Sequence, residues 1–324
     1  MKKGYLYIGI TTILFSTMEI VLKTVSNNFN PIQLTLERFF IGGLVLLPLA
    51  IKSLKKREVS ITKEDVKQFT LLGFIGVVVS MIFYQLAVIN TNASVVAVIF
   101  SCNPVFVMFF AFFILKEKIY KHNIISLMLE VIVIIIIINP LSSKLSSLGV
   151  TFTLLASLTF ALYSVLGKKT TSKFGGEVVT CFSFILGSIE MFFLVLLSYI
   201  QPISNFFITN NLNNFANIPL SSGFNLDNLI SIIYIFIFIT GLGYASYFKA
   251  MEETCANTAS LVFFFKPALS PILAFIFLKE IIPFNMIIGI LLILSGSIFT
   301  ILYNIKMDKS SINYINHKNK IIAK

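Results

Sequence analysis

Long apolar runs, separated by short polar segments, fill most of the chain. A helix rises about 1.5 Å per residue, so a run of about 20 apolar residues can cross a hydrocarbon core of about 30 Å. Backbone N–H and C=O groups in lipid need partners within their own segment, which makes such runs helices. The pattern predicts ten membrane-spanning helices, at about 4–22, 32–51, 68–89, 93–115, 123–139, 148–167, 177–200, 228–250, 256–278 and 282–304.

The composition agrees with a protein that lies mainly in lipid. Hydrophobic residues make up 57% of the chain and charged residues only 12%, whereas a soluble domain has roughly 25% charged residues. We therefore expect an all-α membrane protein. Lys2 and Lys3 before an apolar run resemble a signal peptide, but no A-x-A cleavage pattern follows, and we interpret the run as a retained helix.

The basic residues indicate how the chain is oriented. Most of them fall in the segments that ten spans place on the side of the N-terminus, and only three fall in segments on the opposite side: Lys23, Lys144 and Lys279. Cytoplasmic loops carry an excess of Lys and Arg, so we expect a multi-pass protein of a bacterial inner (cell) membrane with both termini in the cytoplasm. The net charge of +11 follows these loops, and nucleic acid is not an expected partner.

The chain contains an internal repeat. Residues 104–117 read PVFVMFFAFFILKE and residues 267–280 read PALSPILAFIFLKE. Five spans per half is an odd number, so the two halves enter the membrane in opposite senses. We expect two inverted five-helix repeats around a central cavity, over residues 1–140 and 141–304, followed by a basic cytoplasmic tail at 305–324. The long external loop at 201–227, with a surface helix expected around 206–215, is either a tolerated insertion or a lid.

Three segments of the chain resemble a known family. The two repeated segments and residues 154–169, LLASLTFALYSVLGKK, look like the EamA-type domains of the drug/metabolite transporter superfamily. The resemblance covers about residues 4–304 and implies ten helices around a cavity built mainly from the first four helices of each half. It also implies export or exchange of small metabolites, without fixing the substrate. Inverted repeats are themselves typical of carriers, which bind substrate near the midplane between the repeats.

Lys266 is the most informative polar residue within a span. A charge at mid-membrane costs about 2.5–3.5 kcal/mol on insertion scales, which makes it a functional candidate. Lys266 precedes Pro267, and its repeat equivalent Asn103 precedes Pro104. We expect Lys266 to bind an anionic group of the substrate, Asn103 to supply hydrogen bonds, and the two prolines to act as hinges. The alternative is that Lys266 joins a carboxylate in a helix-packing ion pair.

Other polar residues within the spans are candidates for coupling or for ion pairs. Glu19 and Glu190 could each pair with Lys266 or carry a coupling proton, and Glu19 is preferred because the first helix of the family lines the cavity. Arg38 resembles an Arg common at this place in the family and could pair with Glu19 or serve as a structural clamp. Glu130 is a weaker candidate. Aromatic residues could line the cavity, although packing is the simpler role for each of them: Tyr84, Tyr163 and Tyr247.

The sequence gives no sign of an enzyme or a metal protein. Its three cysteines and two histidines lack metal-ligand spacing, so we expect no metal, no cofactor and no catalytic residues. The favoured function is a secondary transporter, most simply an exporter, of a small amino-acid-like or otherwise anionic metabolite. An uptake carrier of the same fold, or a channel or structural membrane subunit, is the alternative. The expected partners are the substrate and the lipid bilayer, and a homodimer is left open.

Overall fold

The computed structural model describes residues 2–117, 119, 146–292 and 294–295, together with the isolated positions 124, 128, 132 and 136. All regular structure in these residues is helical. Seven helical segments are long and apolar enough to cross a membrane: Lys3–Val25, Pro31–Arg57, Lys63–Asn90, Ala93–Leu115, Ser147–Phe174, Gly176–Leu197 and Leu229–Glu253. The chain is therefore an all-helical, multi-pass membrane protein.

The helices follow one another with short connections. The α-helices are α1 (Lys2–Val25), α2 (Pro31–Arg57), α3 (Lys63–Gly73), α4 (Met81–Asn90), α5 (Ala93–Phe100), α6 (Asn103–Phe110), α8 (Ser147–Phe174), α9 (Gly176–Leu197), α10 (Gln201–Thr209), α11 (Leu229–Ile233), α12 (Tyr244–Glu253), α13 (Ala256–Ala259) and α14 (Val262–Leu278). Three π-helical segments continue α3, α6 and α11: η1 (Phe74–Ser80), η2 (Ala111–Leu115) and η4 (Tyr234–Gly243). A short 3-10 turn, η3 (Asn213–Phe215), follows α10.

The seven long segments coincide with seven of the predicted spans, which confirms the helical class. The span expected at 256–278 is divided into α13 and α14 by a turn at residues 260–261. The span expected at 123–139 with its Glu130, the second half of that expected at 282–304, and the tail at 305–324 lie outside the described residues, apart from isolated positions. The number of ten spans therefore stays a prediction.

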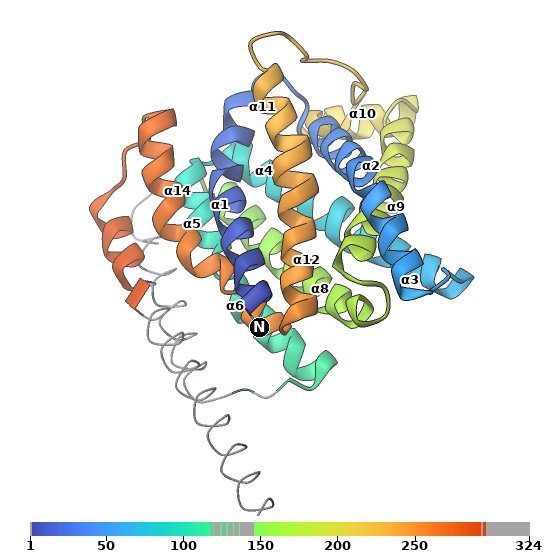
Figure 1. Ribbon diagram of the computed structural model, residues 1–324. Coiled ribbons are helices and arrows are strands. Elements are labelled where there is room, and N and C mark those ends of the chain that lie inside the picture. The colour runs from blue at the N-terminus through green and yellow to red at the C-terminus, as the bar shows by residue number, and fades with distance from the viewer. Residues whose placement is uncertain are drawn as a thin grey trace, which may run out of the picture.

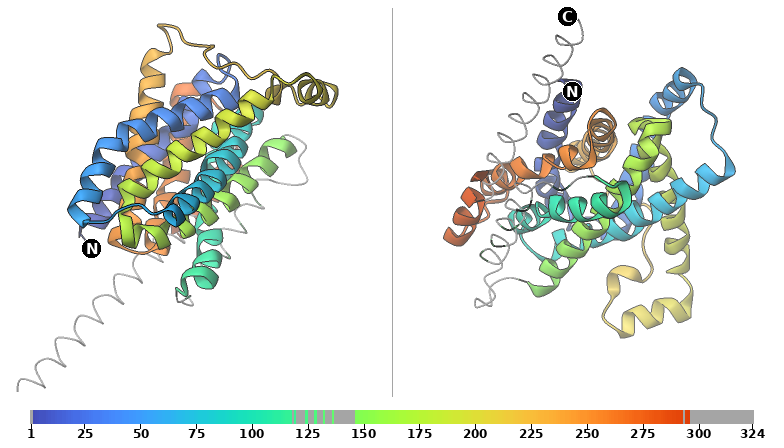
Figure 2. Two further views of the ribbon diagram at one scale, coloured as in Figure 1. Left: turned by 90° about the vertical axis from the view of Figure 1, so that its right-hand side faces the viewer. Right: turned by 90° about the horizontal axis from the view of Figure 1, so that it is seen from below.

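The bundle brings the beginning of the chain against its end. Helix α1 lies beside α12 and η4 on one side and beside α14 on the other, and α14 also packs on α5 (Figure 1). Helix α2 packs along α9, and α4 packs along α8. The two further views show the same elongated bundle, with α10 projecting from one end (Figure 2). Each of these contacts joins a segment before residue 140 to one after it.

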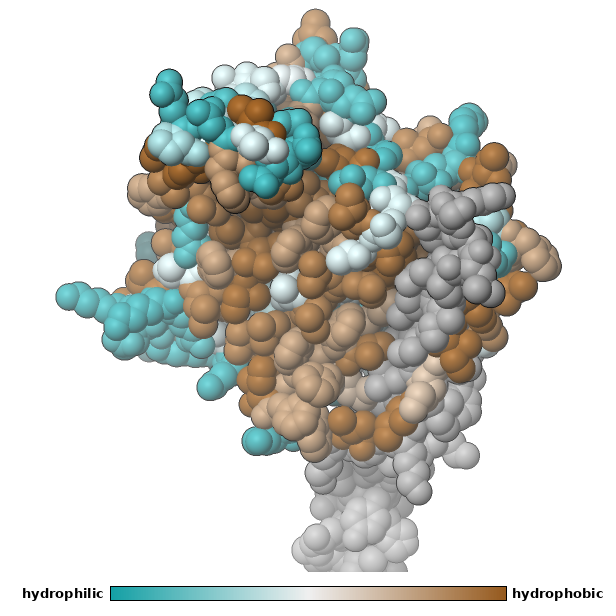
Figure 3. Space-filling model, turned by 180° about the vertical axis from the view of Figure 1, so that it is seen from behind, coloured by the Kyte–Doolittle hydropathy of each residue, from teal (hydrophilic) through white to brown (hydrophobic). Residues whose placement is uncertain are grey.

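The surface of the bundle suits a bilayer. From behind, a broad hydrophobic band separates hydrophilic residues that gather toward opposite ends of the molecule (Figure 3). Large apolar side chains are exposed on several helices, among them Phe109, Phe113, Phe193 and Phe277, each at least 56% exposed. Such a band would be unfavourable in water and is stable in hydrocarbon.

Local sequence explains where α2 and α3 begin. The Asn30 side chain accepts hydrogen bonds from the N–H groups of Ile32 and Gln33 at 2.9 and 3.3 Å, and Pro31 fills the first helical position. Thr62 and Asp65 form a capping box at the start of α3. These side chains bind backbone N–H groups that have no partner within the helix.

The 201–227 segment folds over the start of α2 rather than extending freely. It contains α10 and η3, so the helix expected near 206–215 begins earlier, at Gln201. Ser222 exchanges two hydrogen bonds with the Gln33 side chain, at 2.8 and 2.9 Å, and the Asn30 side chain donates to Asn214 O at 3.0 Å. These contacts hold the segment against one end of the bundle, as either a lid or a packed insertion would be held.

Gly73 and Gly187 let α3 and α9 touch backbone to backbone. A Cβ added at Gly73 would lie 2.5 Å from the Gly187 nitrogen. We expect Gly73→Ala to destabilise the protein by about 1–3 kcal/mol, because the helices must move apart. Gly9→Ala on α1 meets nothing within 4 Å and should be neutral or slightly stabilising. Thermal unfolding in detergent compares the two, and equal melting temperatures would contradict the close crossing.

Candidate functional site

An ion pair lies in the fully buried interior of the bundle. The Lys266 ammonium on α14 contacts the Glu19 carboxylate on α1, and both side chains have no exposed surface. Residues on α14 and α1 meet because these helices pack side by side. Bringing two charges out of water is costly unless they stay paired. The pair therefore joins α1 to α14.

Aromatic rings surround this pair. Lys266 Nζ lies 5.0 Å from the ring centre of Phe100, 5.7 Å from that of Tyr84 and 5.9 Å from that of Phe263. Rings from α1, α8 and α12 extend the cluster: Phe15, Phe160 and Tyr247, with centroid separations of 5.6–6.0 Å from Tyr247 to the other two. Ring faces attract cations, so the cluster stabilises the ammonium without giving it a second counter-charge.

Asn103 holds the chain break next to Pro104. Helix α5 ends at Phe100, and α6 begins at Asn103 after a turn. Proline lacks the N–H that would bond to the carbonyl of Phe100. The Ser157 hydroxyl of α8 donates to that carbonyl at 3.5 Å, and Asn103 Nδ2 donates to Ser157 O at 2.9 Å. Asn103 Oδ1 has no hydrogen-bond donor among the described residues.

Pro267 is placed differently from Pro104. It lies inside the continuous helix α14, together with Pro271, and the break in this segment comes earlier, at residues 260–261. The two prolines predicted as equivalent hinges thus have unlike surroundings. Helix α14 starts five residues before Pro267, whereas α6 starts one residue before Pro104.

Arg38 is buried without an acidic partner. Its side chain on α2 is 0% exposed, and its Nε and Nη2 atoms have no hydrogen-bond acceptor in the described part of the chain. Its neighbours are the Met18 sulfur, 4.0 Å from Nη1, and the Phe39 ring, 4.7 Å from Cζ. The expected pair between Arg38 and Glu19 is absent, since Glu19 is taken by Lys266. The fully buried charged groups of the centre therefore have a surplus of one positive charge.

The other predicted residues lie farther from the pair. Tyr163 donates to or accepts from the Ser183 hydroxyl at 2.9 Å and packs on Phe248, which is a helix-packing role. Glu190 is not near Lys266, contrary to one of the two expected pairings. It lines a pocket at the surface between α3 and α9 that is also lined by Lys67.

The residues around the pair correspond between the two halves. Glu19 in the first half corresponds to Ser164 in the second half, at an offset of 145 residues. Asn103 corresponds to Lys266, at an offset of 163 residues. The same offset relates Tyr84 to Tyr247 and Phe100 to Phe263. All of these side chains except Ser164 belong to the predicted site or its aromatic surround, and all are buried. The centre is thus built from equivalent positions, and each half contributes one charged residue where the other half has a neutral polar one.

The glutamate that ends each repeated segment binds the start of the span that contains the other repeated segment. Lys279 adopts a left-handed conformation (φ 57°) that ends α14 and turns the chain. Glu280 then accepts hydrogen bonds from the backbone N–H groups of Ala93 and Ser94, at 2.8 and 3.0 Å. Its carboxylate therefore caps the N-terminus of α5, where a negative charge is favourable.

The equivalent contact recurs at the other end. Lys116 has the same left-handed conformation (φ 58°). Glu117 accepts a hydrogen bond from Ala256 N at 3.2 Å and from the Asn257 side-chain amide at 2.7 Å, at the start of α13. Each of the two spans, expected at 93–115 and 256–278, thus ends where the other begins, so the two lie antiparallel. We call the contacts of Glu117 and Glu280 the two end caps.

A lysine stands beside each end cap. Lys23 Nζ donates to the carbonyls of Val88 and Thr91 at 2.7 and 2.9 Å, at the end of α4. Lys168, its equivalent at an offset of 145, donates to Met251 O and Thr254 O at the end of α12. Cations are favourable at helix C-termini. These caps are not among the predicted site residues, although the matched Leu-Lys-Glu ends are a sequence signal from which they could have been found.

The described residues contain no group of three or more His, Cys, Asp or Glu side chains that could hold a metal ion. The centre instead offers an ammonium, a carboxylate, a guanidinium and an amide oxygen, and aromatic rings lie against its two cations. Such a set can bind a small molecule through charge and hydrogen bonds, and two of its charges are already matched with each other.

Comparison with known proteins places the chain among transporters. The sequence model of the EamA-like transporter family matches residues 2–139 and 147–302. A protein of Clostridium kluyveri described as an uncharacterized transporter is 37% identical over 95% of this chain and 96% of its own length. An uncharacterized transporter of Archaeoglobus fulgidus is 24% identical over 91% and 97%. The PecM protein of Dickeya dadantii is 25% identical over 69% of each chain.

One solved crystal structure shares the fold. It superposes with a TM-score of 0.66 at 16% sequence identity, covering 94% of this chain and 99% of its own. At this identity the likeness concerns the fold alone. The two family matches together span nearly the whole chain, and the relative from Clostridium kluyveri is similar over nearly all of it. The chain therefore belongs to the EamA-like transporter family.

Proposed function

We propose that this protein is a secondary transporter that carries a small anionic or amino-acid-like metabolite by alternating access. The observation that carries the proposal is the buried centre, where the Lys266–Glu19 ion pair and the unpaired Arg38 lie between segments of both family matches. A carrier needs charged groups at such a place, because its substrate must exchange water for protein contacts.

The groups at the centre suit a substrate with an anionic group. Arg38 offers donors in a planar fork that matches a carboxylate, and its guanidinium has no counter-charge among the described residues. Glu19 could receive the ammonium of an amino-acid-like substrate while Lys266 and Asn103 face its carboxylate. The aromatic cluster would accommodate an apolar or aromatic body. Arg38 thus joins Lys266 as a proposed anion-binding residue.

The ion pair also gives the empty carrier a stable state. In the carrier without substrate, Glu19 would neutralise Lys266 through the contact between their fully buried side chains. A bound zwitterion would supply the same charges and replace that contact. We propose that this exchange lets the protein reorient both with and without substrate, so that export, exchange and uptake differ only in the gradients that drive them.

The two end caps are the proposed gates. Ten spans in two inverted repeats, with the boundary near residues 140–146, would put Glu117 on the cytoplasmic face and Glu280 on the outer face. The antiparallel contact of the two repeated segments and the two family matches support this arrangement. Breaking one cap would free that face while the other stays closed.

Neutralising one cap should therefore open one face only. Glu280→Gln is expected to raise labelling of Cys102, which is 3% exposed, by an impermeant maleimide from outside, about fivefold for the loss of about 1 kcal/mol of capping. Glu117→Gln should raise labelling from the cytoplasmic side. Each variant is the control for the other, in a Cys181→Ala/Cys255→Ser background. Equal effects from both sides would contradict separate gates.

The proposal is tested in cells by comparing metabolites in the medium. Overexpression of the protein should increase at least one anionic or zwitterionic metabolite outside, and Lys266→Met should abolish that increase at equal protein level. A channel or structural subunit would instead give no selective change, or one that Lys266→Met leaves intact.

A further inference from the structure

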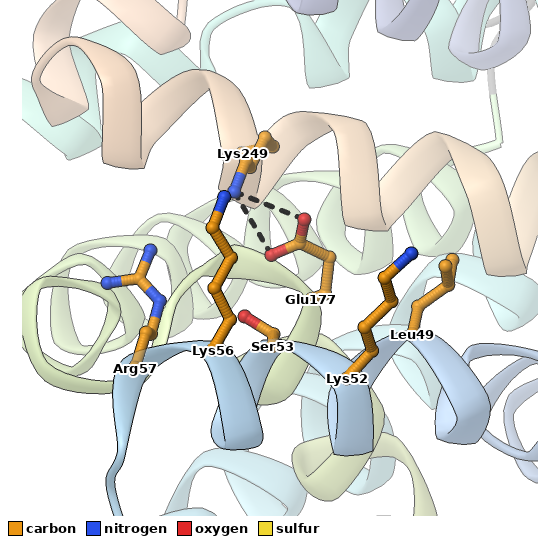
Figure 4. A pocket seen from close by; sticks show the side chains of 7 residues that line it. All are labelled: Leu49, Lys52, Ser53, Lys56, Arg57, Glu177 and Lys249. Carbon is orange, nitrogen blue, oxygen red and sulfur yellow. Dashed lines mark hydrogen bonds and ion pairs between the residues drawn. The ribbon is translucent and has the colours of Figure 1, made fainter.

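A second charged site lies at the end of α2, away from the buried centre. A pocket of about 300 Å³ opens between α2, α9 and α12. Its lining comprises Leu49, Lys52, Ser53, Lys56, Arg57, Glu177 and Lys249. Figure 4 shows Lys56 extending toward Lys249 and Glu177, with Arg57 on one side of it and Lys52 on the other. The central residues Lys266, Glu19 and Arg38 do not line it.

The floor of this pocket is a neutral network. Lys249 contacts Glu177 and Glu252, both at 3.1 Å, and Arg57 forms an ion pair with Glu252. Glu252 also accepts a hydrogen bond from Gly176 N at 2.8 Å, at the start of α9. Two cations and two carboxylates thus balance, and the network fixes the three helices around the pocket.

Lys52 and Lys56 carry the charge that is left over. They lie one turn apart on α2, both are exposed, and neither has an acidic partner in the described part of the chain. Ser53 between them adds a hydroxyl to the same rim. The pocket therefore has a surplus of two positive charges at its mouth, which calls for an anion with several acceptor oxygens.

The apolar wall indicates which anion fits. Leu49, one turn before Lys52, is 47% exposed, and Leu44 and Phe40 earlier on α2 are 43% and 42% exposed. Along α2, the exposed side chains thus change from apolar at Phe40, Leu44 and Leu49 to basic at Lys52 and Lys56. A free phosphate would use only the lysines, whereas a lipid would also lay its acyl chains along the exposed apolar residues.

We propose that this pocket binds the phosphate headgroup of an anionic membrane phospholipid, with Lys52 and Lys56 as the residues that hold it. The lipid would join α2 to α12, the helix that carries Tyr247 of the central cluster. Binding there would stabilise the packing of the two halves at this end of the protein, independently of which metabolite is carried.

The test uses the full-length protein in detergent with added lipid. Phosphatidylglycerol should raise the melting temperature of the wild type, while phosphatidylcholine and inorganic phosphate should not. Each basic residue near an anionic lipid contributes about a fivefold factor in affinity, so Lys52→Gln/Lys56→Gln should bind phosphatidylglycerol on the order of 30-fold more weakly. Single variants should each show part of this loss.

The matched control is Lys55→Gln/Lys63→Gln, which removes the same charge from exposed lysines outside the pocket. It should keep the wild-type response to phosphatidylglycerol. If both double variants lose the response to phosphatidylglycerol equally, the specific site is wrong, and the lipid is attracted by general surface charge. If inorganic phosphate raises the melting temperature as much as phosphatidylglycerol does, the lipid proposal is wrong, and the pocket binds free phosphate.

Discussion

Lys266→Met is expected to destabilise the protein by about 3–5 kcal/mol and to abolish transport, because it leaves the Glu19 carboxylate buried without a counter-charge. Both side chains are fully buried, and no other cation pairs with Glu19 among the described residues. The loss should appear as a lower melting temperature in detergent. The same variant should fail to release the metabolite that the wild type exports.

A double-variant cycle separates stability from function. Replacing both charges, in Glu19→Met/Lys266→Met, should restore most of the stability, because well-packed apolar residues often replace a buried ion pair without loss. Transport should remain absent in the double variant. A Lys266→Met protein that is stable and active would contradict the central role of the pair. Recovery of transport in the double variant would reduce it to a packing contact.

Arg38→Met is expected to have the opposite effect on stability. Burying an unpaired guanidinium is costly, and an apolar side chain of similar length removes that cost. We expect the free energy of unfolding to increase by an amount on the order of 1–4 kcal/mol, and the melting temperature to rise with it. Transport should fall at least about tenfold, because the substrate anion loses a charged hydrogen-bonding partner. A residue that gains stability and loses function on substitution is typical of a binding site.

The control for this variant keeps the charge. Arg38→Lys should remain close to the wild type in stability but transport poorly, because an ammonium cannot make the two parallel hydrogen bonds of a guanidinium. Thermal unfolding and metabolite release measure both properties on the same samples. A lower melting temperature in Arg38→Met would instead identify Arg38 as a structural clamp, which the sequence left open.

The sequence identified the helical class and the residues of the centre for a physical reason. Charged residues are rare within apolar runs, so Glu19, Arg38 and Lys266 are conspicuous without any structure. Their pairing was not predictable in the same way. The pairing depends on which helices are neighbours. Helix α1 contacts α14, so Glu19 pairs with Lys266, and Arg38 has no acidic partner among the described residues. Glu190 is conspicuous for the same reason, yet its helix face turns to the surface between α3 and α9.

The end caps show a second limit of sequence reasoning. The matched Leu-Lys-Glu ends were visible as a repeat, but a carboxylate at a helix end is also common on solvated surfaces. Only the antiparallel packing brings Glu280 to Ala93 and Glu117 to Ala256. Pro104 and Pro267 likewise differ in their distance from the start of their helix, which the similar motifs did not reveal.

Flux in proteoliposomes tests most directly whether the protein is a carrier. The purified protein would be reconstituted, and uptake of the labelled metabolite found in the medium would be measured with and without the same metabolite inside. Alternating access predicts saturable uptake that internal substrate stimulates, and its loss in Lys266→Met. Uptake that rises linearly with concentration and ignores internal substrate would contradict a carrier and indicate a channel.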